Sequence, residues 1–242
     1  MYKLDKKIIF SEIKKHGFFM QKNFITDDHI AKARQEYEEF FLTSSPYPQT
    51  QSINPEILLK LPWRKYSVGS KSGNGEPYSQ LLQTTYFSST TPGFPALTSI
   101  FKKMIMLRNF LTGMPNDYGN NLKLDEFWNA CRVHHYPSGG GHMAQHKDTL
   151  FPKLLSEFEL PFIQIMITFS KRDEDFHSGG GYVLKKGEKF FFEGRGCYGD
   201  LVIFDGNTEH GVDDIDNNEL LDMSRSNGRM ALFVSLYKNL NR

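Results

Sequence analysis

The sequence contains the stretch Tyr136-Pro137-Ser138-Gly139-Gly140-Gly141-His142-Met143-Ala144-Gln145-His146-Lys147-Asp148, in which a histidine and an aspartate stand two positions apart. In extended backbone, residues at positions i and i+2 point to the same side. The imidazole of His146 and the carboxylate of Asp148 can therefore bind one metal ion together. With a second histidine from elsewhere in the fold they would form a triad of two histidines and one carboxylate, which leaves coordination positions open and suits Fe(II).

The second histidine has a clear candidate in His210. It follows the apolar, strand-like run Asp200–Phe204 and a polar turn, Asp205-Gly206-Asn207-Thr208-Glu209. A turn after a strand reverses the direction of the chain, so we expect His210 to be directed back toward the metal. The sequence thus predicts a metal site built from His146, Asp148 and His210.

An arginine, Arg229, begins the last apolar run of the chain, Gly228–Tyr237. The guanidinium group donates two parallel hydrogen bonds to a carboxylate, which makes arginine the natural partner of a carboxylate ligand. The competing residue is Arg225, which belongs to the polar loop from Asp213 to Ser226. We favour Arg229 because it is attached to the predicted strand.

Short apolar segments separated by Gly-, Asp- and Asn-containing turns follow one another after about Leu122. They predict strands at Asn129–Tyr136, Pro161–Ser170, Gly181–Leu184, Lys189–Glu193, Asp200–Phe204 and Met230–Tyr237. Many short strands without intervening helices are typical of an antiparallel sandwich or barrel. The expected fold class is mainly β with N-terminal helices, around a double-stranded β-helix (jelly roll, cupin-like) core.

The first half of the chain favours helices and loops. Helical spacing predicts a helix over Asp5–His16 ended by Gly17, a second one that begins at Thr26 or Asp27, and a third over Ala96–Leu111 that packs outside the sheet. Phe18–Phe24 has the pattern of a short strand. The Ser-, Pro- and Gly-rich region Thr43–Pro95, with Val68–Gly75 as an exposed loop, is a candidate lid.

We expect residues 1–242 to form one domain. In this scheme residues 1–121 are a helical and looped support with the candidate lid, and residues 122–242 are the jelly-roll core.

The ordered set of motifs resembles the 2-oxoglutarate/Fe(II)-dependent dioxygenase superfamily, over about Cys131 to Tyr237. Its details are similar to the prolyl- and lysyl-hydroxylase-like branch, and the N-terminal strand and helix resemble the start of phytanoyl-type dioxygenases. The resemblance implies that His146, Asp148 and His210 hold a catalytic Fe(II), that Arg229 binds the distal carboxylate of 2-oxoglutarate, and that Tyr136 hydrogen-bonds the same ligand. It also implies dioxygen as a substrate and allows for ascorbate as an accessory reductant.

By that resemblance, oxidative decarboxylation of 2-oxoglutarate to succinate is coupled to hydroxylation of a substrate. Related halogenases have a small residue where Asp148 stands, so hydroxylation is favoured. Nucleobase demethylases carry a second arginine six residues after the first, and here that position is Ser235. The leading expectation is a hydroxylase of a small free metabolite, such as an amino acid or a biosynthetic intermediate. The alternatives are a protein hydroxylase of the prolyl type and a non-catalytic, metal-binding, cupin-like protein.

The charge distribution agrees with a small substrate. The chain has 29 basic and 28 acidic side chains, which are interspersed, and a formal net charge of +1. No polybasic block suggests binding to nucleic acid or to a membrane surface. The two cysteines, Cys131 and Cys197, form no close pair, and the N-terminus lacks the apolar core of a signal peptide. A cytoplasmic protein is the expectation.

Some neighbouring polar residues remain open at this stage. His134, His135 and His142 are not assigned to the metal, because a histidine near such a motif is as often packed or solvent-facing. Arg132, His134 and Tyr136 share one face of a strand, so Arg132 would reach a substrate carboxylate if that face points inward. For Gln164 and Thr168 a role in ligand binding and a structural role are equally plausible.

Overall fold

The chain folds around a curved antiparallel sheet in the computed structural model, which describes residues 4–46, 53–69, 78–122, 125–148, 150–194 and 198–238. The elements in chain order are α1 (Lys6–His16), β1 (Phe18–Gln21), α2 (Asp27–Thr43), the 3-10 helix η1 (Pro55–Leu59), β2 (Trp63–Gly69), β3 (Gln80–Phe87), α3 (Pro95–Thr112), β4 (Phe127–Pro137), β5 (Gly141–His146), α4 (Leu150–Ser156), β6 (Gln164–Thr168), β7 (Gly180–Lys185), β8 (Glu188–Phe191), β9 (Leu201–Phe204), β10 (His210–Ile215) and β11 (Gly228–Lys238).

The strands form two layers, which are joined through β3. In the larger layer the order is β1-β9-β6-β11-β4-β3, with β2 paired to β3, and in the smaller layer it is β5-β10-β7-β8. Strand β3 pairs with β4 over Gln83–Phe87 and with β5 at Gln80 and Leu81, which joins the two layers. This is the predicted mainly β, jelly-roll architecture, and the expectation is confirmed.

The longest pairing lies at the centre of the larger layer, between β4 and β11. Their register runs without interruption from Gly228 opposite Pro137 to Lys238 opposite Phe127. Because side chains alternate across a strand, one face of this ribbon is largely apolar, apart from His135, and is buried under the helices. The other face carries arginine, histidine and tyrosine into the interior of the jelly roll.

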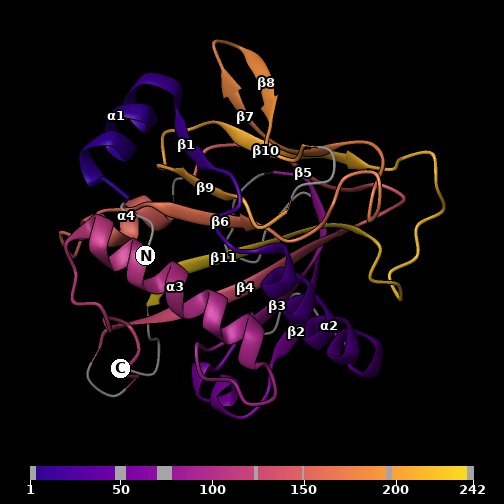
Figure 1. Cartoon of the computed structure of the whole chain (residues 1–242), viewed down its shortest axis with the longest axis horizontal. Helices are drawn as coiled ribbons and strands as arrows, with labels where there is room; N and C mark the ends of the chain where they lie inside the picture. Colours follow the sequence, from indigo (N-terminus) through magenta and orange to yellow (C-terminus); the bar gives the residue numbers. More distant parts are fainter. Residues whose placement is uncertain are drawn as a thin grey trace.

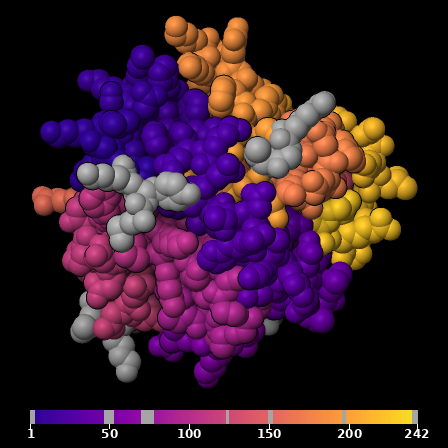
Figure 2. All heavy atoms as spheres, viewed as in Figure 1, coloured from indigo at the N-terminus to yellow at the C-terminus, as the bar shows by residue number. Residues whose placement is uncertain are grey.

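The N-terminal helices cover the outer face of the larger layer. Helix α1 is capped at its N-terminus by Asp5, whose side chain accepts a hydrogen bond from the Lys7 N–H, and at its C-terminus by Gly17 in the left-handed conformation. Helix α3 ends in the same way at Gly113. Figure 1 shows α3 lying across the face of the sheet, and Figure 2 shows N-terminal and central segments, indigo to magenta, covering much of the same view. Among the described residues, no helix combines the length and apolar character needed to cross a bilayer.

The region Thr43–Pro95 differs from its predicted looped character, because it contains η1, β2 and β3. The segment Gln80–Phe87 is rich in β-branched and aromatic residues, but the average composition of the longer region hid this short run. Of the predicted exposed loop, only Val68 and Gly69 are described, and both lie in β2. Residues 47–52 and 70–77 lie outside the described part of the chain, as does Cys197. Strands β5 and β10 and helix α4 were also not predicted.

A buried histidine on the outer face of β4 links stability to pH. His135 is fully buried, its Nε2 lies 2.7 Å from the carbonyl oxygen of Asn227, and burial lowers its pKa from 6.5 to about 4. Between these two pH values the unfolded chain binds a proton that the folded chain does not. The stability that the neutral ring contributes is therefore complete above about pH 6.5 and is lost as the pH falls toward 4.

We predict that His135→Gln reduces this dependence. Urea unfolding of wild type and variant at pH 7.5 and pH 5.0 gives two free-energy differences. The free energy of unfolding of wild type minus that of the variant should be smaller by about 2 kcal/mol at pH 5.0 than at pH 7.5, since each pKa unit corresponds to about 1.4 kcal/mol. A difference that stays constant between the two pH values would contradict the assignment.

Candidate active site

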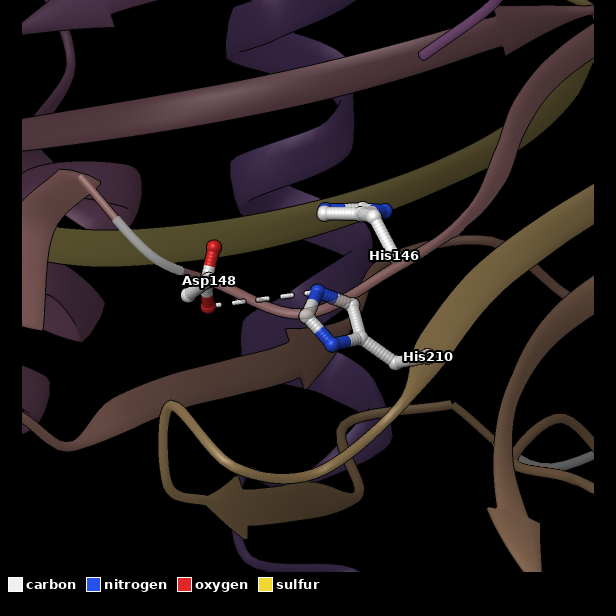
Figure 3. A group of neighbouring side chains, drawn as sticks. All are labelled: His146, Asp148 and His210. Carbon is white, nitrogen blue, oxygen red and sulfur yellow. Dashed lines mark ion pairs between the residues drawn. The ribbon is translucent and has the colours of Figure 1, made fainter. Parts of the chain in front are cut away.

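Three side chains predicted to bind metal converge at one end of the interior cavity (Figure 3). His146 is the last residue of β5, Asp148 follows it by two positions, and His210 is the first residue of β10. Strands β5 and β10 are antiparallel neighbours with His146 opposite His210, so the pairing itself brings the two rings together. One ligand atom from each of the three residues lies within 4.8 Å of the others, and His210 Nε2 is 3.9 Å from Asp148 Oδ2.

The backbone fixes the tautomer of each ring. His146 Nδ1 lies 2.9 Å from the carbonyl oxygen of Ala144, and His210 Nδ1 lies 2.9 Å from that of Thr208. A carbonyl oxygen only accepts hydrogen bonds, so each Nδ1 carries the proton and each Nε2 presents its lone pair. Burial lowers the pKa of His210 to about 4, which keeps this ring neutral. The donor set of two imidazole nitrogens and one carboxylate fits Fe(II).

Aromatic rings hold the two histidines in place. Tyr78 stacks on His146 with ring centroids 4.2 Å apart, and Phe204 packs against His210 at 4.7 Å. Tyr78 was not predicted as a site residue. It precedes β3, far from the metal motif in sequence, and only the pairing of β3 with β5 brings it to the site.

Arg229 lies within the same cavity, with a side chain that is 1% exposed. Its Nε donates to Glu193 Oε1 at 2.7 Å, and its Nη2 contacts Met166 Sδ at 3.5 Å. Its Nη1 is buried and has no hydrogen-bond acceptor among the described residues. The guanidinium is thus held through Nε, while its fork retains donors for a ligand. By contrast, the side chain of Arg225 is 72% exposed and pairs with Asp222.

Glu193 is a site residue that sequence reasoning missed. Its side chain is fully buried, and its second carboxylate oxygen accepts a hydrogen bond from the Gly181 N–H at 3.0 Å. Gly181 is required here, because a Cβ at this position would lie 2.7 Å from Arg229 Cζ. In the sequence Glu193 resembles any charged residue that ends a strand, and only the fold places it beside Arg229.

Tyr136 lies next to Arg229 across the central ribbon. The two residues are opposite each other in the β4–β11 register, and the guanidinium lies 5.2 Å from the centre of the tyrosine ring. The hydroxyl lies 3.9 Å from Met143 Sδ and 3.5 Å from His134 Nδ1. Burial raises the pKa of Tyr136 to about 12, so the hydroxyl stays protonated and can donate to a ligand.

The cavity of about 120 Å³ extends from the triad along the inner faces of β2, β3, β4 and β11. Among the residues left open by the sequence, Arg132, His134 and Gln164 line it. Thr168 has a structural role, since its hydroxyl accepts a hydrogen bond from the Asp200 N–H. His142 points elsewhere and contacts Gly140 and Ser79. Among the described residues, only His146, Asp148 and His210 form a cluster that could hold a metal ion.

Comparisons with known proteins give no match to a family model and none to a curated sequence. Several solved structures are similar. A prolyl hydroxylase from Trichoplax adhaerens, in complex with a peptide fragment of the hypoxia-inducible factor oxygen degradation domain, is 11% identical, with a TM-score of 0.60 over 96% of this chain and 89% of that one. A Pseudomonas putida prolyl-4-hydroxylase is 14% identical, with a TM-score of 0.58 over 97% and 99%.

A third similar structure is that of SnoN, a non-haem α-ketoglutarate-dependent epimerase from nogalamycin biosynthesis. It is 9% identical, with a TM-score of 0.55 over 96% of this chain and 82% of that one. Identities this low establish the fold alone. The chain therefore has the fold of the 2-oxoglutarate/Fe(II) oxygenases, and the resemblance predicted from its sequence motifs is confirmed at the level of the fold.

Proposed function

We propose that this protein is a 2-oxoglutarate- and Fe(II)-dependent dioxygenase that hydroxylates a small free metabolite. One observation carries the proposal: the triad of His146, Asp148 and His210 opens into the same cavity as Arg229, whose Nη1 is buried without an acceptor among the described residues. A buried cationic donor left without an acceptor is costly unless a ligand fills the position. A dicarboxylate co-substrate beside the metal meets that need.

Each residue has a defined task in this proposal. The two Nε2 atoms and the carboxylate of Asp148 would hold the iron, and the fork of Arg229 would bind the distal carboxylate of 2-oxoglutarate, with Tyr136 donating a further hydrogen bond. The bound iron and 2-oxoglutarate would supply the oxidising power drawn from dioxygen. Glu193 keeps the guanidinium fixed, so that little reorganisation accompanies binding.

The lining of the cavity supports a small substrate. Ser67 of β2, Tyr86 of β3 and Tyr78, which precedes β3, line one side of the cavity. This wall supports a pocket for a small substrate over an open groove. The alternative of a prolyl-type protein hydroxylase is favoured by the likeness to two prolyl hydroxylases, one of them bound to a peptide.

The metal site has a direct test. Anaerobic addition of Fe(II) and 2-oxoglutarate should give a weak visible charge-transfer band in wild type, and oxygen should then release succinate. We expect His146→Ala and His210→Ala to lose the band, because each removes one of three ligands. His142→Ala, on the same strand as His146, is the matched control and should retain the band. Absence of the band in wild type would refute the proposed function.

The position of Arg229 can be tested without changing Arg229 itself. In Gly181→Ala the new methyl group displaces the guanidinium, so the affinity for 2-oxoglutarate should fall at least about tenfold, while Fe(II) affinity stays close to that of wild type. In the control, Gly194→Ala, the added Cβ meets only Lys22 Nζ, at 3.5 Å. Isothermal titration with each variant separates the two affinities. Equal loss of 2-oxoglutarate binding in both variants would count against this placement.

The substrate class can be resolved by turnover. We expect small metabolites, rather than proline-containing peptides, to stimulate succinate release above the uncoupled rate, since the cavity is walled by β2 and β3. Measuring succinate with both sets under identical conditions checks this. Stimulation by peptides alone would favour the protein hydroxylase.

A further inference from the structure

Two cations in the cavity have no role in the proposed function: Arg132 on β4 and Lys65 on β2. Both lie on the inner face of the larger layer. Lys65 is opposite Thr84, Thr84 is opposite His134, and Arg132 is two positions before His134 on the same strand. Strands lie about 4.8 Å apart, so β2 and β4 are separated by about 10 Å, and two long side chains on them reach into the same space.

Arg132 is buried but only partly bonded. Its side chain donates from Nη1 to the Tyr237 hydroxyl at 3.1 Å and from Nη2 to Ser235 Oγ at 2.6 Å. Its Nε is buried and has no acceptor among the described residues. A guanidinium has five N–H donors, so most of them remain available. Within the described part of the chain, no carboxylate forms an ion pair with Arg132.

The other buried arginines show how this chain usually satisfies such a group. Arg34 and Arg229 each pair with carboxylates. Arg64 donates to backbone carbonyl oxygens, and Arg108 donates to the amide oxygens of asparagine side chains. Arg132 differs from all four because its acceptors are hydroxyl groups, and of these arginines only Arg132 and Arg229 line the cavity. Arg64 Nε and Arg108 Nη1 are also buried without an acceptor among the described residues, so the orphaned Nε alone does not distinguish Arg132. What distinguishes it is an orphaned donor on a cavity-lining guanidinium that has neither a carboxylate nor a carbonyl partner.

Lys65 adds a second positive charge to the same wall. Its ammonium group lies 5.7 Å from the ring of Tyr86 and 5.9 Å from that of Trp63, and it has no ion pair in the described part of the chain. Burial and the charge of Arg132 both lower the pKa of Lys65. An anion bound between the two groups would offset both the burial and the repulsion.

The carboxylates in and beside the cavity are already engaged elsewhere. Asp148 belongs to the metal triad, and Glu193 is bonded to Arg229. Among the described residues that line the cavity, Asp148 is the one carboxylate, whereas Lys65, Arg132 and Arg229 are cations. The part of the lining formed by β2 and β4 thus carries two uncompensated positive charges, set among the aromatic rings of Tyr86, Phe233 and Tyr237.

We propose that Arg132 and Lys65 bind a carboxylate group of the substrate, so that the substrate is a small organic acid with an apolar body that lies between this anchor and the triad. This inference rests on the proposed function and narrows its substrate class. The planar fork of a guanidinium matches the geometry of a carboxylate, and a neighbouring ammonium adds positive charge without restricting the orientation of the carboxylate.

The test compares matched probes that differ only in charge. Protein loaded with Mn(II) and 2-oxoglutarate is titrated calorimetrically with 3-phenylpropionate and 3-phenylpropionamide, and with hexanoate and hexanamide. Wild type should bind the carboxylates at least about tenfold more tightly than the amides. Arg132→Gln should abolish this preference, Lys65→Met should reduce it, and Arg132→Lys, which keeps the charge, should retain part of it. Arg225→Gln, an exposed arginine outside the cavity, is the control and should behave as wild type.

Three results would overturn the inference: carboxylates and amides that bind equally to wild type, no binding of either carboxylate, or an unchanged preference in Arg132→Gln. A loss of 2-oxoglutarate affinity in Arg132→Gln but not in Gly181→Ala would also overturn it, because Arg132 would then bind the co-substrate. Failure of the proposed function is distinguishable. In that case 2-oxoglutarate does not bind to wild type at all, whereas the preference for carboxylate probes is still measurable with Mn(II) alone.

Discussion

The uninterrupted pairing of β4 with β11 is the constraint on which the rest of the structure depends. It fixes which side chains point toward the helices and which point inward over the whole length of both strands. A shift of one residue would exchange the two faces, and would place Arg132, His134 and Tyr136 under the helices. The apolar outer face, with residues such as Val133 and Leu232 packed against α2 and α3, makes that exchange unfavourable. Packing of the apolar core thus fixes the strand register that places the polar side chains in the cavity.

Local signals made much of this structure predictable. The helix ends at Gly17 and Gly113 could be predicted because glycine adopts the left-handed conformation observed there. The convergence of His146, Asp148 and His210 could be predicted because His146 and Asp148 are close in sequence, and because a strand and a turn precede His210. Arg229 was favoured over Arg225 by its attachment to a strand, and the burial of one and the exposure of the other agree with that choice.

What could not be predicted depends on contacts between distant segments. Strands β2 and β3 were not recognised because the region has a loop-like composition, and the place of β3 in the sheet depends on its pairing with β4 and β5, which lie much later in the chain. Glu193 is 36 residues from Arg229, and nothing in its local sequence indicates that it forms a buried ion pair. Tyr78 reaches His146 by the same kind of long-range placement. Many helices and strands could thus be predicted from local sequence, whereas the polar contacts around the cavity could be found only once the strand pairing was known.

The position of β3 limits which fragments of the chain can fold on their own. Because β3 pairs with β2 along one edge, and with β4 and then β5 along successive stretches of the other, it covers backbone edges of both layers. A fragment that began after α3 would expose unpaired N–H and C=O groups on β4 and β5, and such open edges recruit other chains and lead to aggregation. It would also lose one wall of the cavity. The segment that contains β2 and β3, although loop-like in composition, is therefore as necessary to a closed fold as the strands that carry His146 and His210.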